Sequence, residues 1–137
     1  MVLHVVVDAQ VDFMIPGGAL YIPGSEKIIP NLVKYLYDIP SSDDVLFTLD
    51  THFANTYSAS EEAKQFPLHC EFMTKGHELV LNTDLVSSGW SMEKSVFSMW
   101  ETEDDPCLIG NTGFAGIYTT YSRADFFKIM KEKHSGE

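Results

Sequence analysis

The chain has 137 residues, a length typical of a single domain, so we expect one domain over residues 1–137. It carries 20 acidic against 9 basic side chains, and this formal charge of −11 argues against nucleic acid and anionic membranes as partners. Apolar residues make up 45% of the sequence, which is enough for a folded core. No apolar run approaches the roughly 20 residues of a membrane span, and no signal-peptide pattern is found. These features predict a cytoplasmic globular protein.

Two short apolar runs predict parallel strands. Residues 2–7 read VLHVVV and end at Asp8, and residues 45–49 end at Asp50. Continuous apolar runs of this length are typical of strands that are buried on both faces. Between them, apolar residues recur at helical spacing over residues 26–37. The order strand, helix, strand is the unit from which parallel sheets with right-handed crossovers are built.

The segments around these elements have weaker patterns. Residues 9–26 contain several Pro and Gly and predict a long loop, and loops of that length are usually functional. Residues 79–81 are a weak strand candidate, and residues 101–116 are expected to form an acidic loop.

A final helix is predicted over residues 122–133. Ser122 and Asp125 resemble a capping box at its start. The buried face is expected to contain Phe126, Phe127, Ile129 and Met130. Such a face needs a sheet to cover it, yet only two strands are strongly predicted. The sequence therefore predicts an α/β fold of three layers, a parallel sheet flanked by helices, that is incomplete at its C-terminus.

Acidic and imidazole side chains gather at the carboxyl ends of the predicted strands, where open parallel sheets bind ligands. Asp8 and Asp50 both lie at this edge. Asp50 and His52 are two residues apart, so their side chains point the same way in extended backbone. With His69 they would form a three-ligand site for a divalent metal, and such ligands bind Zn²⁺, Fe²⁺ or Mn²⁺. An Asp after a strand is also often only a turn residue, so the spacing leaves both interpretations open. The remaining histidines, predicted to be structural or surface residues, are His4, His77 and His134.

Four segments of the chain form a pattern in sequence order. They are VVVDAQVDFMIPGGAL at residues 5–20, FTLDTHFANTYSAS at residues 47–60, FPLHC at residues 66–70 and EKSVF at residues 93–97. Together they resemble the nicotinamidase/pyrazinamidase branch of the isochorismatase-like cysteine hydrolases. The specific parts are the D-x-Q-x-D-F opening and the pairing of D-x-H with F-P-x-H-C. The resemblance covers residues 2–97 and extends to residues 122–133.

This resemblance implies catalytic roles for two residues. Members of the family convert nicotinamide to nicotinate and ammonia, a step of NAD salvage, with an Asp, a Lys and a nucleophilic Cys. Asp8 matches the Asp, which acts as a base toward the thiol and then as an acid toward the leaving ammonia. Lys94 matches the Lys, whose charge would hold a thiolate and orient the carboxylate.

The resemblance also implies a metal centre and a substrate pocket. Asp50, His52 and His69 match the ligands of a divalent metal, with Zn²⁺ expected and Fe²⁺ or Mn²⁺ as alternatives, and the metal orients the pyridine nitrogen of nicotinamide. Aromatic positions that line the pyridine pocket are matched by Phe13 and Phe66. Polar positions close to the site, to which no chemical step is assigned, are matched by Gln10 and Asp12.

The nucleophile is where the chain departs from the family. In the family this cysteine follows the strand that comes after the final helix described above, and the chain ends before that point. Cys70 matches a cysteine that often accompanies the metal histidine and is not the attacking thiol. Cys107 follows the acidic segment 101–105, whose carboxylates would raise a thiol pKa. Neither cysteine is therefore expected to attack the substrate.

Three functions are compatible with these observations. The first is a nicotinamidase-type amidase that pairs with itself or with a partner chain supplying the missing C-terminal part. The second is a non-catalytic truncated relative that binds metal or nicotinamide without turnover. The third is hydrolysis by metal-bound water with Asp8 as base, which would survive alkylation of every thiol.

Overall fold

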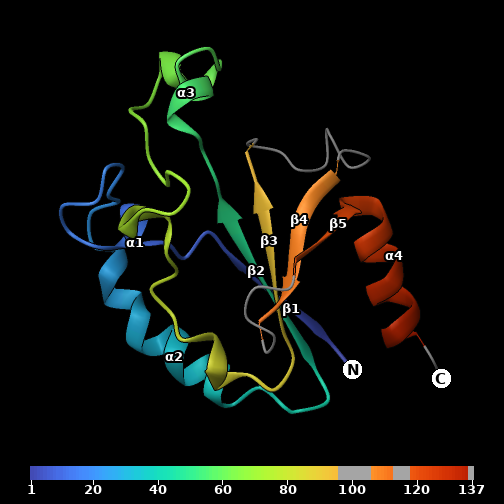
Figure 1. Ribbon diagram of the computed structural model, residues 1–137. Helices are drawn as coiled ribbons and strands as arrows, with labels where there is room; N and C mark the ends of the chain where they lie inside the picture. Colours follow the sequence, from blue (N-terminus) through green and yellow to red (C-terminus); the bar gives the residue numbers. More distant parts are fainter. Residues whose placement is uncertain (96–105, 113–117, 136–137) are drawn as a thin grey trace.

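The computed structural model describes residues 1–95, 106–112 and 118–135, and one sheet lies at its centre (Figure 1). The strands of the described residues follow chain order across the sheet: β1 (Leu3–Val7), β2 (Asp44–Asp50), β3 (Gly89–Lys94), β4 (Pro106–Asn111) and β5 (Tyr118–Ser122). β1, β2 and β3 run parallel to one another. β4 and β5 extend the sheet as antiparallel strands beside β3.

Helices lie on both faces of this sheet. They are α1 (Val11–Met14), α2 (Ile29–Tyr37), α3 (Ala54–Tyr57) and α4 (Arg123–His134), and single turns of 3₁₀-helix occur at Ser25–Ile28, Glu62–Lys64, Lys75–His77 and Thr83–Leu85. α2 covers one face and α4 the other (Figure 1). This arrangement confirms the predicted three-layer α/β fold. Within the described residues, no helix has the length and apolar character needed to cross a membrane.

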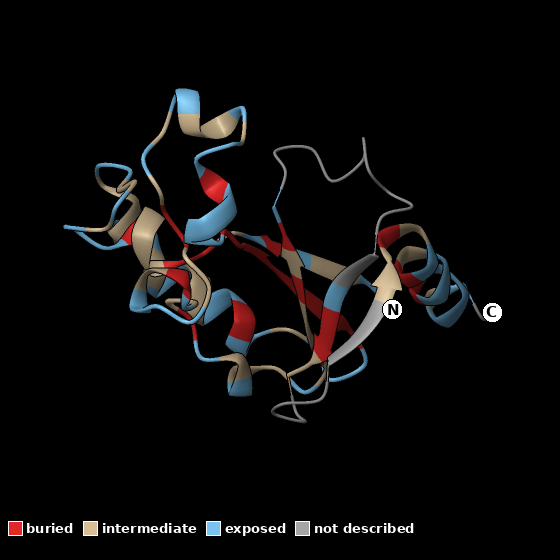
Figure 2. Ribbon diagram, turned by 45° about the horizontal axis from the view of Figure 1, so that its top comes forward, coloured by how far each residue is buried: buried red, intermediate tan, exposed pale blue. Residues whose placement is uncertain are grey.

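The core consists of two layers that meet at β2. Every residue of β2 is buried (Figure 2), which confirms the prediction for residues 45–49. Side chains alternate along the strand, so Val45 and Phe47 pack toward α2 while Leu46 packs toward α4. The layer against α2 also contains Val6, Ala9, Met14, Leu36 and Leu81. The layer against α4 also contains Met92, Ile109, Phe126 and Met130.

The prediction that residues 2–7 are buried on both faces is wrong. β1 forms as expected, but Val5 is 48% exposed and Val7 is 65% exposed, while Val6 between them is buried against α2. Among the described residues β1 is the outermost strand on its side, and the cluster against α4 is formed by β2, β3 and β4, with only Leu3 of β1 packed against it. Val5 and Val7, farther along the same face of β1, are therefore left exposed.

Other local predictions were also wrong. Residues 9–26 contain helix α1 rather than only a loop, and residues 79–81 form no strand, since Leu79 makes a single bridge with Gln10. The acidic loop predicted over residues 101–116 contains β4, and β5 was not predicted. Pairing with β3 forms β4 although its sequence contains Pro and Gly, so tertiary context overrides local propensity here.

The final helix begins as predicted. The Ser122 side chain accepts a hydrogen bond from the backbone N–H of Asp125 at 3.0 Å, which caps α4. Phe126 and Met130, one helical turn apart, are buried against the sheet. Ile129 is 43% exposed, because it lies about 100° around the helix from Met130. Its predicted place in the buried face was therefore wrong.

Candidate active site and metal centre

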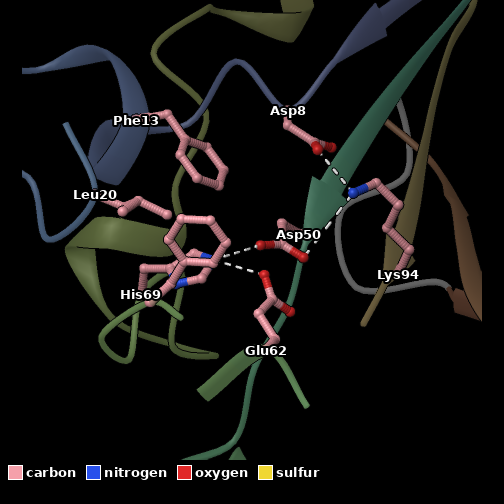
Figure 3. Close-up of a pocket in the computed structure, with 8 residues that line it drawn as sticks. Asp8, Phe13, Leu20, Asp50, Glu62, His69 and Lys94 are labelled. Carbon is pink, nitrogen blue, oxygen red and sulfur yellow. Dashed lines mark hydrogen bonds and ion pairs between the residues drawn. The ribbon is translucent and has the colours of Figure 1, made fainter. Parts of the chain in front are cut away.

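A pocket of about 150 Å³ opens at the carboxyl ends of β1, β2 and β3 (Figure 3). It is lined by Asp8, Phe13, Leu20, Asp50, Glu62, Phe66, His69 and Lys94. Asp8 follows β1, whereas Asp50 and Lys94 are the last residues of β2 and β3. Parallel pairing brings these three strand ends to one edge, so residues far apart in sequence meet in one pocket.

Four potential metal ligands converge beside the pocket. One donor atom from each of Asp50, His52, Glu62 and His69 lies within 4.8 Å of all the others. Asp50 Oδ2 is 3.1 Å from His52 Nε2 and 3.0 Å from His69 Nε2. The Glu62 carboxylate lies 3.4 Å from His52 Nε2 and 3.5 Å from His69 Nε2. We call these four residues the tetrad.

The tetrad has the chemistry and the spacing of a zinc site. Two imidazole nitrogens and two carboxylates are ligands that Zn²⁺ binds, and a tetrahedral ion with bonds of about 2.0–2.1 Å separates its ligand atoms by about 3.3 Å. The separations of 3.0–3.5 Å between the carboxylate oxygens and the imidazole nitrogens fall around this value. Glu62 was not among the predicted ligands. It lies in an irregular stretch of sequence with no motif around it, and a turn of 3₁₀-helix brings it to the site.

Hydrogen bonds to the far side of His69 orient its ring. Nδ1 lies 2.7 Å from the carbonyl oxygen of Pro67, so an N–H at this position donates to the backbone. This bond leaves Nε2 free of its proton when the ring is neutral and points it at Asp50 and Glu62 (Figure 3). Tyr57 Oη reaches the same backbone turn, 3.1 Å from the carbonyl oxygens of Phe66 and Pro67.

The charges of the tetrad influence its protonation. Burial tends to raise the pKa of Asp50, but hydrogen bonds from His52 and His69 and the charge of Lys94 lower that pKa well below its ordinary value. Burial tends to lower the pKa of His69, but its hydrogen bonds to Asp50 and Pro67 and the charges of Asp50 and Glu62 raise the pKa overall. The carboxylates of Asp50 and Glu62 thereby favour the protonated form of His69.

Zinc binding should depend on pH through His69. A metal ion and a proton compete for Nε2, so zinc affinity should fall as pH decreases through the raised pKa of His69, starting above the ordinary value of 6.5. Below that pKa we expect an affinity loss of about tenfold per pH unit for the one proton displaced. Calorimetry in buffers of different ionisation heat measures the released proton. An affinity that is constant between about pH 5.5 and 8 would contradict this prediction.

Asp8 and Lys94 form an ion pair on the other side of the pocket. Lys94 Nζ lies 2.7 Å from Asp8 Oδ2 and 3.9 Å from Asp50 Oδ1 (Figure 3). Thr48 Oγ1 donates a hydrogen bond of 2.6 Å to Asp8 Oδ1. The backbone of Asp8 has a φ of +50°, a left-handed conformation that Asp adopts more readily than most residues. The chain thereby turns out of β1 with the carboxylate held between Thr48 and Lys94.

Apolar side chains cover the wall opposite Lys94. Phe13 and Leu20 reach this wall from the segment that follows β1 (Figure 3), and Phe66 also lines the pocket. The Phe13 ring contacts the His69 ring at a centroid distance of 5.4 Å. The pocket is smaller than the roughly 300–1,000 Å³ that drug-sized ligands occupy. Its size therefore suits a molecule with a single ring.

Cys70 is buried beside the tetrad and is a free thiol. Burial and the carboxylates of Asp50, Asp12 and Asp8 raise its pKa, and the charge of Lys94 only partly opposes them. A thiol in this state is a poor nucleophile. Cys107 belongs to β4, but its side chain lies outside what the structure describes. The three remaining histidines each contact a protein side chain: His4 contacts Asp43, His77 contacts Thr51 and His134 contacts Asp44.

Cys70 should resist alkylation in the folded chain. Its full burial and raised pKa both suppress the reactive thiolate, so iodoacetamide at neutral pH should leave it largely unmodified. Mass spectrometry of the peptide containing Cys70 checks this prediction, with the same chain in urea as the control. Equal labelling of Cys70 in the folded and denatured chains would contradict it.

Solved structures with a similar fold are hydrolases. The pyrazinamidase of Pyrococcus horikoshii, in complex with zinc, matches 97% of this chain and 65% of its own length, with 29% sequence identity and a TM-score of 0.64. The nicotinamidase/pyrazinamidase of Bacillus subtilis matches 96% of this chain and 65% of its own length, with 24% identity and a TM-score of 0.63. The PnC1 protein of L. infantum, in complex with nicotinate, matches 70% and 48% of the two chains, with 25% identity and a TM-score of 0.60.

The match covers nearly all of this chain but only part of the solved structures. The chain spans 65% of the length of the P. horikoshii and B. subtilis proteins. No family model matches the sequence, and no curated protein matches it. The likeness therefore comes from the fold, together with sequence identity of up to 29% among these three structures.

Proposed function

We propose that the chain, whose fold matches solved structures of nicotinamidases and pyrazinamidases, forms the metal-binding part of an amidase that hydrolyses nicotinamide to nicotinate and ammonia. One observation carries the proposal: three residues of the tetrad, Asp50, Glu62 and His69, border the same small pocket as the Asp8–Lys94 pair. The pocket has room for one ring. Around it lie metal ligands, a carboxylate that can accept and donate protons (Asp8) and a fixed cation (Lys94).

The tetrad is the proposed site of a divalent metal, for which zinc is the favoured ion. Zinc is present in the similar P. horikoshii pyrazinamidase, and two imidazoles with two carboxylates suit it. A bound ion would offer a coordination position to the pyridine nitrogen of the substrate. Phe13 and Phe66 would then hold the ring against the apolar side of the pocket, with the amide group directed toward Asp8.

Asp8 is the proposed acid–base residue. It would accept the proton of an attacking thiol as the sulfur bonds to the amide carbon, and then deliver that proton to the amide nitrogen, which leaves as ammonia. Water would hydrolyse the resulting thioester, releasing nicotinate and restoring the thiol. Hydrogen bonds from Thr48 and Lys94 hold one oxygen of the carboxylate each, which fixes its direction for both proton transfers.

Lys94 is the proposed electrostatic partner of this chemistry. Its ammonium group lies between Asp8 and Asp50 and is almost fully buried. A cation in this position favours the negative charge that develops on an attacking sulfur and on the carbonyl oxygen of the substrate. The attacking cysteine is proposed to come from a segment other than those described here, because Cys70 is buried with a raised pKa.

Ammonia release and ligand binding together test this function. The zinc-loaded 137-residue chain should bind nicotinamide, and benzamide, which lacks the ring nitrogen, should bind more weakly. By itself the chain should release no ammonia. Addition of a strand-plus-helix segment of the family that bears one cysteine should restore release, and the same segment with Cys→Ser is the matched control.

Two other outcomes would contradict the proposal, and each would favour a different function. A stable complex with the added segment that still releases no ammonia would exclude the amidase function and favour a non-catalytic binder. Turnover by a chain in which both Cys70 and Cys107 are replaced by Ser would favour hydrolysis by metal-bound water instead.

A further inference from the structure

Two polar side chains near the pocket, Gln10 and Asp12, neither line it nor belong to the tetrad. We propose that both are positioning residues of the metal centre. In this proposal Gln10 holds the backbone of Asp50, and Asp12 holds the peptide that follows His69. The inference rests on the proposed function in one respect only, namely that the tetrad binds a metal ion.

The need for Gln10 arises where β1 leaves the sheet. β1 and β2 remain paired up to the hydrogen bond from Asp8 N to the carbonyl oxygen of Thr48. The chain then turns away at Asp8, while β2 continues for two more residues to Asp50. The N–H and C=O of Asp50 face the side that β1 has left, and a buried backbone needs partners for both groups.

The carboxamide of Gln10 takes the place of the missing strand. Its Oε1 accepts a hydrogen bond of 2.8 Å from Asp50 N, and its Nε2 donates one of 2.8 Å to Asp50 O. The second N–H of the amide donates to the carbonyl oxygen of His77 at 2.9 Å. Gln10 is fully buried, so no water competes for these bonds. One side chain therefore fixes the backbone of a metal ligand on both sides of its Cα.

Asp12 acts in the same way on the loop that carries His69. Its Oδ2 accepts a hydrogen bond of 2.7 Å from Cys70 N, and its Oδ1 accepts one of 2.9 Å from Ala19 N. Cys70 has a φ of +45°, a left-handed conformation that costs energy for a residue with a Cβ. The charged hydrogen bond from Asp12 opposes this cost and holds the peptide next to His69.

Residue 70 also contacts the backbone of the second metal histidine. The N–H of His52 donates to the carbonyl oxygen of Cys70 at 3.1 Å, so Asp12 is linked through residue 70 to both metal histidines. Gly76 lies directly against the Asp12 carboxylate, and a Cβ at Gly76 would lie 2.1 Å from Asp12 Oδ2. The absence of a side chain at position 76 thus leaves room for the carboxylate in its hydrogen-bonded position.

Zinc affinity tests the proposal directly. Gln10→Glu keeps the shape and the acceptor but loses both donors, and Asp12→Asn places an NH₂ group against a backbone N–H. We expect each variant to bind zinc about 10–100-fold more weakly, the usual effect of changing a partner of a metal ligand. Affinity is measured by competition with a fluorescent chelator. The matched controls, Gln65→Glu and Asp38→Asn, alter exposed residues and should bind zinc like the wild type.

A spectroscopic readout separates positioning from general loss of stability. The visible absorption of the Co²⁺-loaded chain reports the number and geometry of the ligands, and it should change in Gln10→Glu and Asp12→Asn. Gly76→Ala displaces the Asp12 carboxylate without altering Asp12 itself, so it should weaken zinc binding in the same way. Combining Gly76→Ala with Asp12→Asn should add little further loss, because both changes act on one contact.

The outcomes distinguish this inference from the proposed function. Zinc affinities of Gln10→Glu and Asp12→Asn within twofold of the wild type, with an unchanged cobalt spectrum, would overturn the inference and leave the metal centre intact. If Gln10→Glu fails to fold, Asp12→Asn and Gly76→Ala still test the inference, because they act on the loop that carries His69. A wild-type chain that binds no zinc would overturn the metal centre itself, and the inference with it.

Discussion

Asp50→Asn is expected to remove zinc binding. Asp50 Oδ2 lies within 3.1 Å of both imidazole nitrogens, and its carboxylate supplies negative charge at the centre of the tetrad. Asn keeps the shape but not the charge, so the affinity should fall by more than the roughly 100-fold that marks the upper end of indirect effects. Titration against a fluorescent chelator measures this loss.

Stability offers a second measurement of the same change. At a free zinc concentration about 100 times its Kd, a chain that binds only when folded gains about 2.7 kcal/mol. Wild-type protein should show this gain in urea denaturation, and Asp50→Asn should show none. Asp38→Asn, an exposed change of the same chemistry, should behave like the wild type. An Asp50→Asn variant that retains zinc affinity within tenfold would show that the tetrad is not the metal site.

Lys94→Met is expected to destabilise the metal-free chain by about 3–5 kcal/mol, the usual effect of removing one member of a buried ion pair. Lys94 is the cation between Asp8 and Asp50, at 2.7 Å and 3.9 Å, and its side chain is 8% exposed. Met fills a similar volume but leaves two carboxylates facing each other with no cation between them. Since a domain is typically stable by only about 5–15 kcal/mol, this loss brings the chain close to unfolding.

A double-mutant cycle identifies the cause of that loss. Asp8→Asn combined with Lys94→Met should be less destabilised than Lys94→Met alone, because the unpaired carboxylate is gone. Urea denaturation of the metal-free chains gives the free energy of unfolding for each variant. Lys34→Met removes an exposed lysine that also pairs with an Asp and should have a much smaller effect. A Lys94→Met variant as stable as Lys34→Met would contradict the buried ion pair.

Three of the four tetrad residues could be anticipated from local sequence. An apolar run that ends at Asp50 places this residue at a strand end, and His52 follows at the spacing that puts both side chains on one side. His69 was identified by the F-P-x-H-C resemblance. Glu62 could not be anticipated, because an acidic residue in an irregular stretch has no periodic pattern around it.

The contacts that surround the tetrad join residues that are far apart in the sequence. Asp8 and Lys94 are 86 residues apart, and they meet because β1 and β3 lie on either side of β2. Gln10 reaches Asp50 only because β1 turns away from β2 two residues before β2 ends. The spacing of residues along the sequence predicts neither contact.

The sequence by itself determined the two strands β1 and β2, where the helix α2 lies, and that Asp8 and Asp50 end up at strand ends. These properties follow from local patterns, since the periods of apolar residues and the positions of Pro and capping residues act within a few residues. Only the tertiary structure decided the antiparallel strands β4 and β5, the exposed face of β1, the place of Glu62 and the roles open to Gln10 and Asp12. Those depend on which strands pair and on how loops pass over their ends, and both are set by the packing of distant segments.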